Sequence, residues 1–330
     1  MTKLSVLDLS PVIQGSTPSQ ALRNSLNLAQ AAEGFGYERF WVAEHHNMKG
    51  IASAATSVVI GFIAGGTEKI RVGAGGIMLP NHSPLVIAEQ FGTLASLYPN
   101  RIDLGLGRAP GTDQETSRAL RRTLNGSADD FPNDVMELQH YLKDAEPGQR
   151  VTAVPGAGTN VPLWILGSSL FGAQLAAHLG LPFAFASHFA PADMERALDL
   201  YREGFKPSEQ LQHPYVMLGF NVCVAESDDE AHFLRSSSLQ SFLNLRRGTP
   251  GQLPPPIKNF ESGMSQQDRA MISQLRRCSA VGCLDTVKES MASFVDKTGA
   301  NELMLVCSIY DHDKRVRSFE LAAQAGQQIF

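Results

Sequence analysis

The chain has 330 residues, of which 43% are hydrophobic and 18% charged, and its formal net charge is −5 at pH 7. This is the composition of an ordinary globular protein, and it excludes the strongly basic surface that binds nucleic acid or anionic membranes. The amino-terminal segment has no apolar signal-peptide core, and no stretch approaches the roughly 18 apolar residues of a membrane span, so we expect a cytoplasmic protein with neither kind of partner.

Eight short apolar runs alternate with helical patterns along the chain. Several of them are almost continuously apolar, as parallel strands are when helices cover both faces of their sheet. Because the alternation runs over residues 1–330 without a linker, it predicts one domain of the α/β class, a closed (β/α)8 TIM barrel rather than an open doubly wound sheet. The expected strands are residues 4–9, 39–44, 70–74, 101–106, 163–167, 183–186, 215–224 and 302–307.

Capping residues mark the expected helix boundaries. Thr17 is a typical N-cap residue, Pro18 suits the first helical position, and Gln20 stands where a capping box has its polar partner. A helix is therefore expected to begin here and to be closed by Gly34 and Gly36, since glycine commonly follows the last helical residue.

Three longer segments interrupt this alternation, at 109–128, 145–162 and 248–265. Long loops in barrels are often lids or binding loops. We expect the first and third, which follow the fourth and seventh strands, at the catalytic end of the barrel.

Histidines concentrate directly after the expected strands, where the active site of a TIM barrel lies. We interpret His46, His82 and His188 as candidates for a substrate pocket, together with Asp8 after the first strand and Met78 after the third. A fourth histidine, His45, directly precedes His46 and is expected at the same end.

The histidine spacings do not predict a metal site. The ligand pair His-x-His is absent after the first strand, His-Glu-x-x-His is absent altogether, and the inverted form fails because Trp41 stands where a histidine is required. Neighbouring His45 and His46 point in different directions on an extended chain, so both cannot easily bind one ion. We therefore expect no metal.

An anion site is suggested where the fifth strand meets the following helix. Ser168 and Ser169 offer hydroxyl and backbone N–H groups at a helix N-terminus, where the helix dipole favours negative charge. Arg108, one strand earlier, would supply a countercharge. The alternative is that the two serines only cap the helix. The chain contains no Gly-Lys-Ser/Thr phosphate-binding loop.

Motifs spread over the whole chain carry a family resemblance. They are LSVLDLSPV near the N-terminus, FWVAEHHN (40–47), VGAGGIMLPNHSPLVIAEQFGTL (72–94), NRIDLGLGRAPGTD (100–113), WILGSSLFGAQLAAHLGLPFAFASHF (164–189) and GTPGQLPPPI (248–257). The chain resembles the bacterial luciferase-like flavin-dependent monooxygenases, and within them the YhbW-like subgroup.

The resemblance implies roles for individual residues. His45 matches the family histidine near the reactive edge of the flavin, which makes it the candidate catalytic residue. Gly75-Gly76 matches the site of a non-prolyl cis peptide that packs against the flavin ring in luciferases, where alanines stand instead. Arg108 and the turn after the fifth strand match the segments that hold the flavin phosphate. The cofactor-binding candidates are Gly75, Gly76, Ile77, Arg108, Gly167, Ser168, Ser169 and Gly172.

The resemblance also implies an activity and partners. We expect a two-component monooxygenase that oxidises a small organic substrate with dioxygen and reduced FMN. Because the chain has no nicotinamide-binding fingerprint, we expect a separate flavin reductase to supply the reduced FMN. The alternatives are hydride transfer with a deazaflavin, and flavin binding without turnover. Relatives pair through the helices after strands two and three, and residues 51–64 are apolar nearly all round, so we expect a homodimer.

Overall fold

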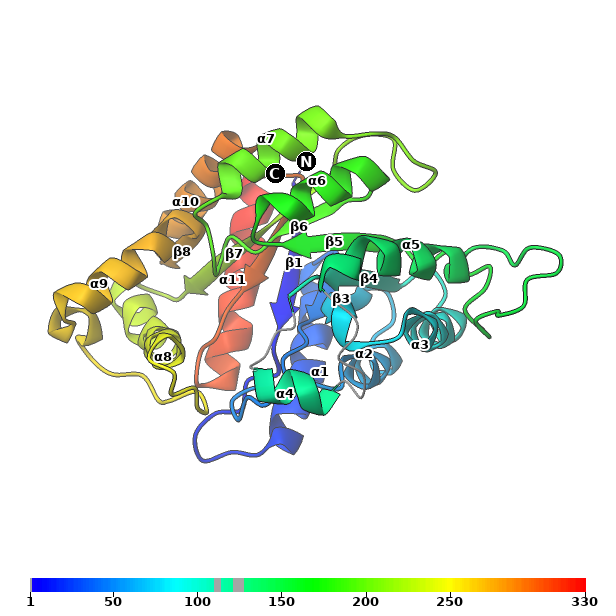
Figure 1. Cartoon of the computed structure of the whole chain (residues 1–330). Helices are drawn as coiled ribbons and strands as arrows, with labels where there is room; N and C mark the ends of the chain where they lie inside the picture. Colours follow the sequence, from blue (N-terminus) through cyan, green and yellow to red (C-terminus); the bar gives the residue numbers. More distant parts are fainter. Residues whose placement is uncertain (1, 110–113, 121–127) are drawn as a thin grey trace.

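The computed structural model describes residues 2–109, 114–120 and 128–330, and its centre is a closed parallel β-barrel (Figure 1). β6 pairs with β7, and β9 pairs with both β7 and β1, so that eight strands close into a ring and the expected TIM barrel is confirmed. These strands are β1 (Lys3–Asp8), β2 (Arg39–Val42), β3 (Arg71–Met78), β4 (Ile102–Gly107), β5 (Leu163–Gly167), β6 (Phe183–Phe185), β7 (Val216–Val224) and β9 (Glu302–Val306).

Helices cover the outside of this ring (Figure 1). They are α1 (Pro18–Phe35), α2 (Thr56–Gly65), α3 (Pro84–Leu97), α4 (Gln114–Leu120), α5 (Phe131–Leu142), α6 (Leu170–Leu179), α7 (Met194–Gly204), α8 (Asp228–Arg246), α9 (Gln266–Ser273), α10 (Leu284–Thr298) and α11 (His312–Ile329). α1 begins as its cap predicts, because the Gln20 backbone N–H donates to Thr17 Oγ1 at 3.2 Å, and Gly36 ends it with a positive φ of 85°. None of the described helices is long and apolar enough to cross a membrane.

One strand of the structure was not predicted from the sequence. β8 (Ser279–Gly282) pairs only with the far end of β7 and lies outside the ring. Its four residues, Ser-Ala-Val-Gly, are too few for a period-two pattern and too small to suggest a strand.

The three interrupting segments have different structures. The segment 109–128 contains α4, and its residues 110–113 and 121–127 lie outside the described part of the chain. The segment 145–162 connects α5 to β5 without a helix or strand. The segment 248–265 follows α8 and returns to the barrel, where Leu253 forms an isolated parallel bridge with Ile13.

The inside of the barrel is built in layers. At the amino-terminal ends of the strands, Arg39 Nε donates to Glu302 Oε1 at 2.7 Å and Arg39 Nη1 to Asp103 Oδ2 at 2.7 Å, all within a buried network. An apolar layer with Trp41 and Trp164 at its centre follows, in which the two indole rings meet edge to face. These two layers fill the barrel interior from the amino-terminal ends of the strands up to the tryptophan pair.

Candidate active site

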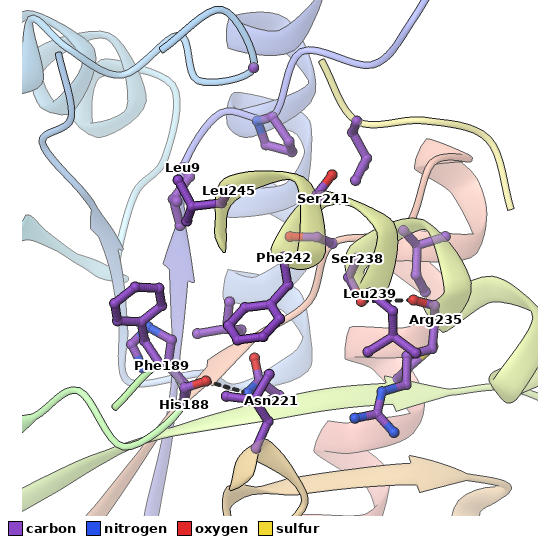
Figure 2. Close-up of a pocket in the computed structure, with 18 of the residues that line it drawn as sticks. Leu9, His188, Phe189, Asn221, Arg235, Ser238, Leu239, Ser241, Phe242 and Leu245 are labelled. Carbon is purple, nitrogen blue, oxygen red and sulfur yellow. Dashed lines mark hydrogen bonds between the residues drawn. The ribbon is translucent and has the colours of Figure 1, made fainter. Parts of the chain in front are cut away.

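Two neighbouring cavities open at the carboxyl ends of the strands. The larger has a volume of about 240 Å³ and lies between α8 and the ends of β1, β7 and β9, as Figure 2 shows. The smaller, about 50 Å³, lies directly on the apolar layer beside Trp41 and Gly75. Both are lined by His188, which therefore stands where they meet. Leu253, from the segment 248–265, forms part of the wall of the larger cavity.

His188 is held in the turn after β6 as a neutral imidazole. Its backbone oxygen accepts a hydrogen bond from Asn221 Nδ2 at 2.7 Å, whereas its buried Nδ1 has no partner in the described part of the chain. Burial, and then the charge of His45, lower the pKa of His188 to about 4. The ring packs directly on Gly219, where a Cβ would lie 2.0 Å from Nδ1, so only glycine leaves room for it. His45 and His188 thus belong to one site.

Glu44, at the end of β2, organises a second group of side chains. Its Oε1 bonds His46 Nε2 at 2.7 Å and His82 Nε2 at 2.8 Å, and its Oε2 accepts the Met78 backbone N–H at 3.0 Å. Burial opposes ionisation of this carboxyl, but the bonds and charge from His82, and then those from His46, lower its pKa. Sequence reasoning did not select Glu44.

This group also has the spacing of a metal site. One ligand atom from each of Glu44, His46 and His82 lies within 4.8 Å of the other two. Sequence spacings missed the group because the ligands come from the ends of two strands rather than from one element. The same atoms that could bind an ion, Nε2 of His46 and of His82, form hydrogen bonds with Glu44 Oε1 in this structure.

The polar residues expected to bind an anion lie at the start of α6. Ser169 is the N-cap residue, but its side chain makes no capping hydrogen bond, and the side chains of Ser168 and Ser169 are exposed. Arg108, at the end of β4, lies over the ring of Phe171 in the first turn of α6, with its guanidinium carbon 4.2 Å from the ring centroid. Arg108 Nη2 also bonds Asp129 Oδ1 at 2.7 Å. A cation thus stands beside the positive end of a helix dipole.

Glycines bring the backbones of β3 and β4 close together beside the smaller cavity. The Gly75-Gly76 peptide bond is cis, and the β3–β4 register shifts between Ala74 and Ile77. A Cβ at Gly76 would lie 2.7 Å from the Gly105 backbone oxygen, so that no side chain fits there. Arg108 and the N-terminus of α6 suit an anionic group, and the apolar cavity walls near His188 suit a flat ring. Together they suit a flat group that carries an anionic tail.

Two of the expected site residues lie elsewhere. Asp8 is fully buried on the outer side of β1, where its Oδ1 accepts from Arg315 Nη2 at 2.6 Å and its Oδ2 from Ser25. Successive residues of a strand point to opposite faces, and therefore Leu7 and Leu9 face the barrel interior while Asp8 faces the helices. Ile77 packs in the core between the barrel and its helices, with 2% exposure. Neither residue lines a described cavity, contrary to our expectation.

The other expected residues fall into separate places. His188 and Gly75 line the cavities, whereas Met78, His46 and His82 surround Glu44 instead. Gly167 and the buried Gly172 approach each other closely at the β5–α6 turn, where a Cβ on Gly167 would lie 3.6 Å from the Gly172 Cα.

Comparison with known proteins identifies the family of the chain. Residues 2–302 match the family model described as luciferase-like monooxygenase. A luciferase-like monooxygenase of Escherichia coli is 53% identical over 325 residues, which are 98% of this chain and 97% of that protein. An N-acetyl-S-alkylcysteine monooxygenase of Bacillus subtilis is 42% identical over 190 residues, 56% of this chain and 57% of that protein. The crystal structure of apo-MsnO8 superposes with a TM-score of 0.88 at 37% identity and covers 99% of both chains.

More distant structures share the fold alone. The oxygenating constituent of 3,6-diketocamphane monooxygenase of Pseudomonas putida, in complex with FMN, has a TM-score of 0.74 at 16% identity, covering 100% of this chain and 99% of that one. An F420-dependent secondary alcohol dehydrogenase has a TM-score of 0.66 at 15% identity, covering 98% of both. Proteins of this fold therefore include both flavin-dependent and F420-dependent enzymes.

Proposed function

Because the chain belongs to the luciferase-like monooxygenase family, we propose that it is an FMN-dependent monooxygenase that oxidises a small organic substrate with dioxygen. Reduced FMN would come from a separate flavin reductase. The observation that carries the proposal is the placement of Arg108 beside the N-terminus of α6, at the same end of the barrel as His45, His188 and the apolar cavities. Bound there, FMN would supply the activation of dioxygen.

In this proposal one group of residues binds the flavin, and a second group holds or transfers protons. Arg108 and the free backbone N–H groups of α6 would hold the phosphate, which is favoured by both the positive charge and the helix dipole. Gly75 and the apolar layer beneath it would face the ring and exclude water. His45 would hold or move a proton beside the substrate, and neutral His188 would offer Nδ1 as a hydrogen-bonding atom.

The role of Arg108 can be separated from the rest of the flavin site with riboflavin, which lacks the phosphate. We expect Arg108→Met to weaken binding of FMN by about 10- to 100-fold, the loss for a charge-assisted hydrogen bond of roughly 1.5–3 kcal/mol, and to leave binding of riboflavin unchanged. Asp129→Asn is the matched control, because it removes the negative charge that bonds Arg108 and leaves the cation in place. Equal weakening of FMN and riboflavin by Arg108→Met would contradict the assignment.

Turnover is tested with purified protein, reduced FMN and dioxygen. We expect the wild type to change the rate at which reduced FMN consumes dioxygen, and His45→Ala to retain FMN binding but lose oxidation of an organic substrate. Binding of a deazaflavin in preference to FMN would favour the hydride-transfer alternative. Intact FMN binding with no oxidation by the wild type would indicate a flavin-binding protein without turnover.

We also propose a homodimer that forms through α2 and α3, which pack next to each other. Val58 and Phe62 on α2 are 71% and 46% exposed, and Leu97 on α3 is 64% exposed. Clustered large apolar side chains on two neighbouring helices are typical of a surface that another protein covers.

A further inference from the structure

The larger cavity has an apolar wall and a single permanent charge. The residues of α8 that line it are Arg235, Ser238, Leu239, Ser241, Phe242 and Leu245. These positions form one stripe of the helix, so the whole stripe faces the cavity. No carboxylate and no second arginine or lysine is among the described residues that line the wall. Figure 2 shows the Arg235 side chain leaving α8 on the side that faces the strands.

Arg235 is buried without a partner for its charge. The residue is 8% exposed, and its guanidinium group makes no hydrogen bond or ion pair within residues 2–109, 114–120 and 128–330. The carboxylate with the largest electrostatic influence on Arg235 is Glu261, but the oxygens of Glu261 lie next to His232 Nδ1 at 3.2 Å and Arg276 Nη2 at 3.3 Å. Burial lowers the pKa of Arg235, although an arginine stays protonated at any physiological pH.

An unpaired buried charge is expensive, and proteins normally pair it or hydrogen-bond it. Arginine offers five N–H donors in a planar fork, which matches the two oxygens of a carboxylate. Building on the proposed monooxygenase function, we propose that the larger cavity binds the organic substrate as a carboxylate, with Arg235 as its anchor. The substrate is thus a small organic acid, and its apolar body lies along Leu239 and Phe242.

The cavity favours a carboxylate over a phosphate. A phosphate group carries close to two negative charges at neutral pH, and the described wall supplies only one permanent positive charge. The volume of about 240 Å³ lies below the roughly 300–1,000 Å³ of most ligand pockets, so the acid is small. Because His188 also lines this cavity, an acid anchored at Arg235 directs its other end towards the smaller cavity and the proposed flavin site.

The experiment compares acids with their uncharged amides. Straight-chain carboxylates of about four to ten carbons, N-acetyl amino acids, and the primary amide of each are titrated against wild type, Arg235→Met and Arg235→Lys, with affinity measured by thermal shift and calorimetry. We expect at least one acid to bind wild type about 10- to 100-fold more tightly than its amide. Arg235→Met, an apolar replacement of similar length, should remove this preference, and Arg235→Lys should reduce it.

Arg246→Met is the matched control on the same helix. Arg246 is exposed, and its guanidinium carbon lies 5.2 Å from the ring centroid of Phe242, so the variant removes a nearby cation from outside the cavity. It should keep the preference for acids. The proposal is overturned if no acid binds more tightly than its amide, or if Arg246→Met removes the preference and Arg235→Met retains it.

The flavin is titrated separately with the same variants. Arg235→Met should bind FMN as wild type does, and a loss of FMN affinity would assign Arg235 to the flavin phosphate and overturn the proposal. Acid binding at Arg235 without any FMN binding would refute the proposed function alone. FMN binding without an acid preference would refute the substrate class alone.

Discussion

Protonation of His188 should make the protein less stable in mild acid. The pKa of this buried imidazole is about 4, below its ordinary value of 6.5, because burial and the charge of His45 disfavour the protonated form. Between these two pH values the unfolded chain binds a proton that the folded chain does not. The free energy of unfolding therefore keeps its full value above about pH 6.5 and falls as the pH drops towards about 4.

The size of the effect follows from the same two values. The pKa of His188 falls from 6.5 in the unfolded chain to about 4 in the folded chain, and this difference lowers the free energy of unfolding by roughly 3 kcal/mol once the pH has dropped below both values. Most of this loss, roughly 2 kcal/mol, should occur between about pH 7.5 and about pH 5, where urea unfolding is readily measured.

His188→Gln isolates the contribution of this residue, because glutamine is polar but does not titrate. We expect the stability difference between wild type and His188→Gln to shrink by roughly 2 kcal/mol between about pH 7.5 and about pH 5. His213→Gln, at an exposed position, is the control and should follow the wild-type profile. If the profiles of wild type and His188→Gln run parallel across this range, the imidazole is not held neutral by the fold and the reasoning fails.

Three further predictions concern packing and assembly. Arg39→Met leaves the buried Glu302 without its cation, so the free energy of unfolding measured in urea titrations should fall by about 3–5 kcal/mol. A loss well below that range would show that the network tolerates removal of the cation. Gly76→Ala should lower the free energy of unfolding by about 1–3 kcal/mol, because the added methyl group meets the Gly105 backbone oxygen. Gly34→Ala in α1, with open space around it, should not, and equal thermal midpoints for the two variants would contradict this. If the proposed homodimer forms through α2 and α3, Phe62→Glu should elute as a monomer in gel filtration, and an elution volume equal to that of the wild type would contradict this interface.

The fold was largely predictable because its signals are local. Short apolar runs alternating with helical patterns predicted all eight barrel strands, and the cap at Thr17 predicted the start of α1. β8 could not be predicted, since four small residues carry no pattern and the strand exists only because the long β7 offers an unpaired end. Its stability comes from tertiary contacts rather than from its own sequence.

The candidate site was predictable only in outline. The rule that active sites follow barrel strands pointed to the end of the barrel where the two cavities open, but it does not say which way a side chain points. Asp8 faces outwards because alternate residues of a strand point to opposite faces, and there it pairs with Arg315, which comes from the distant C-terminal part of the sequence. The contact between Glu44 and His46 could have been predicted, since residues two positions apart in an extended segment lie on the same side. Arg235 had none, because a charged residue beside serines in a helix resembles a solvated surface until the packing of α8 is known.

The pairing of Asp8 with Arg315 has a consequence for the way the protein is made. The two residues are 307 positions apart, and both are buried. At roughly 5–20 residues per second, a ribosome that has produced Asp8 needs about 15–60 s more before Arg315 exists. During this time the carboxylate of Asp8 lacks its cation, and the edge of β1 that pairs with β9 has no partner strand. The nascent chain must therefore wait as an open sheet, and we expect chaperones that shield such edges to matter more for its yield in cells than for its stability once complete.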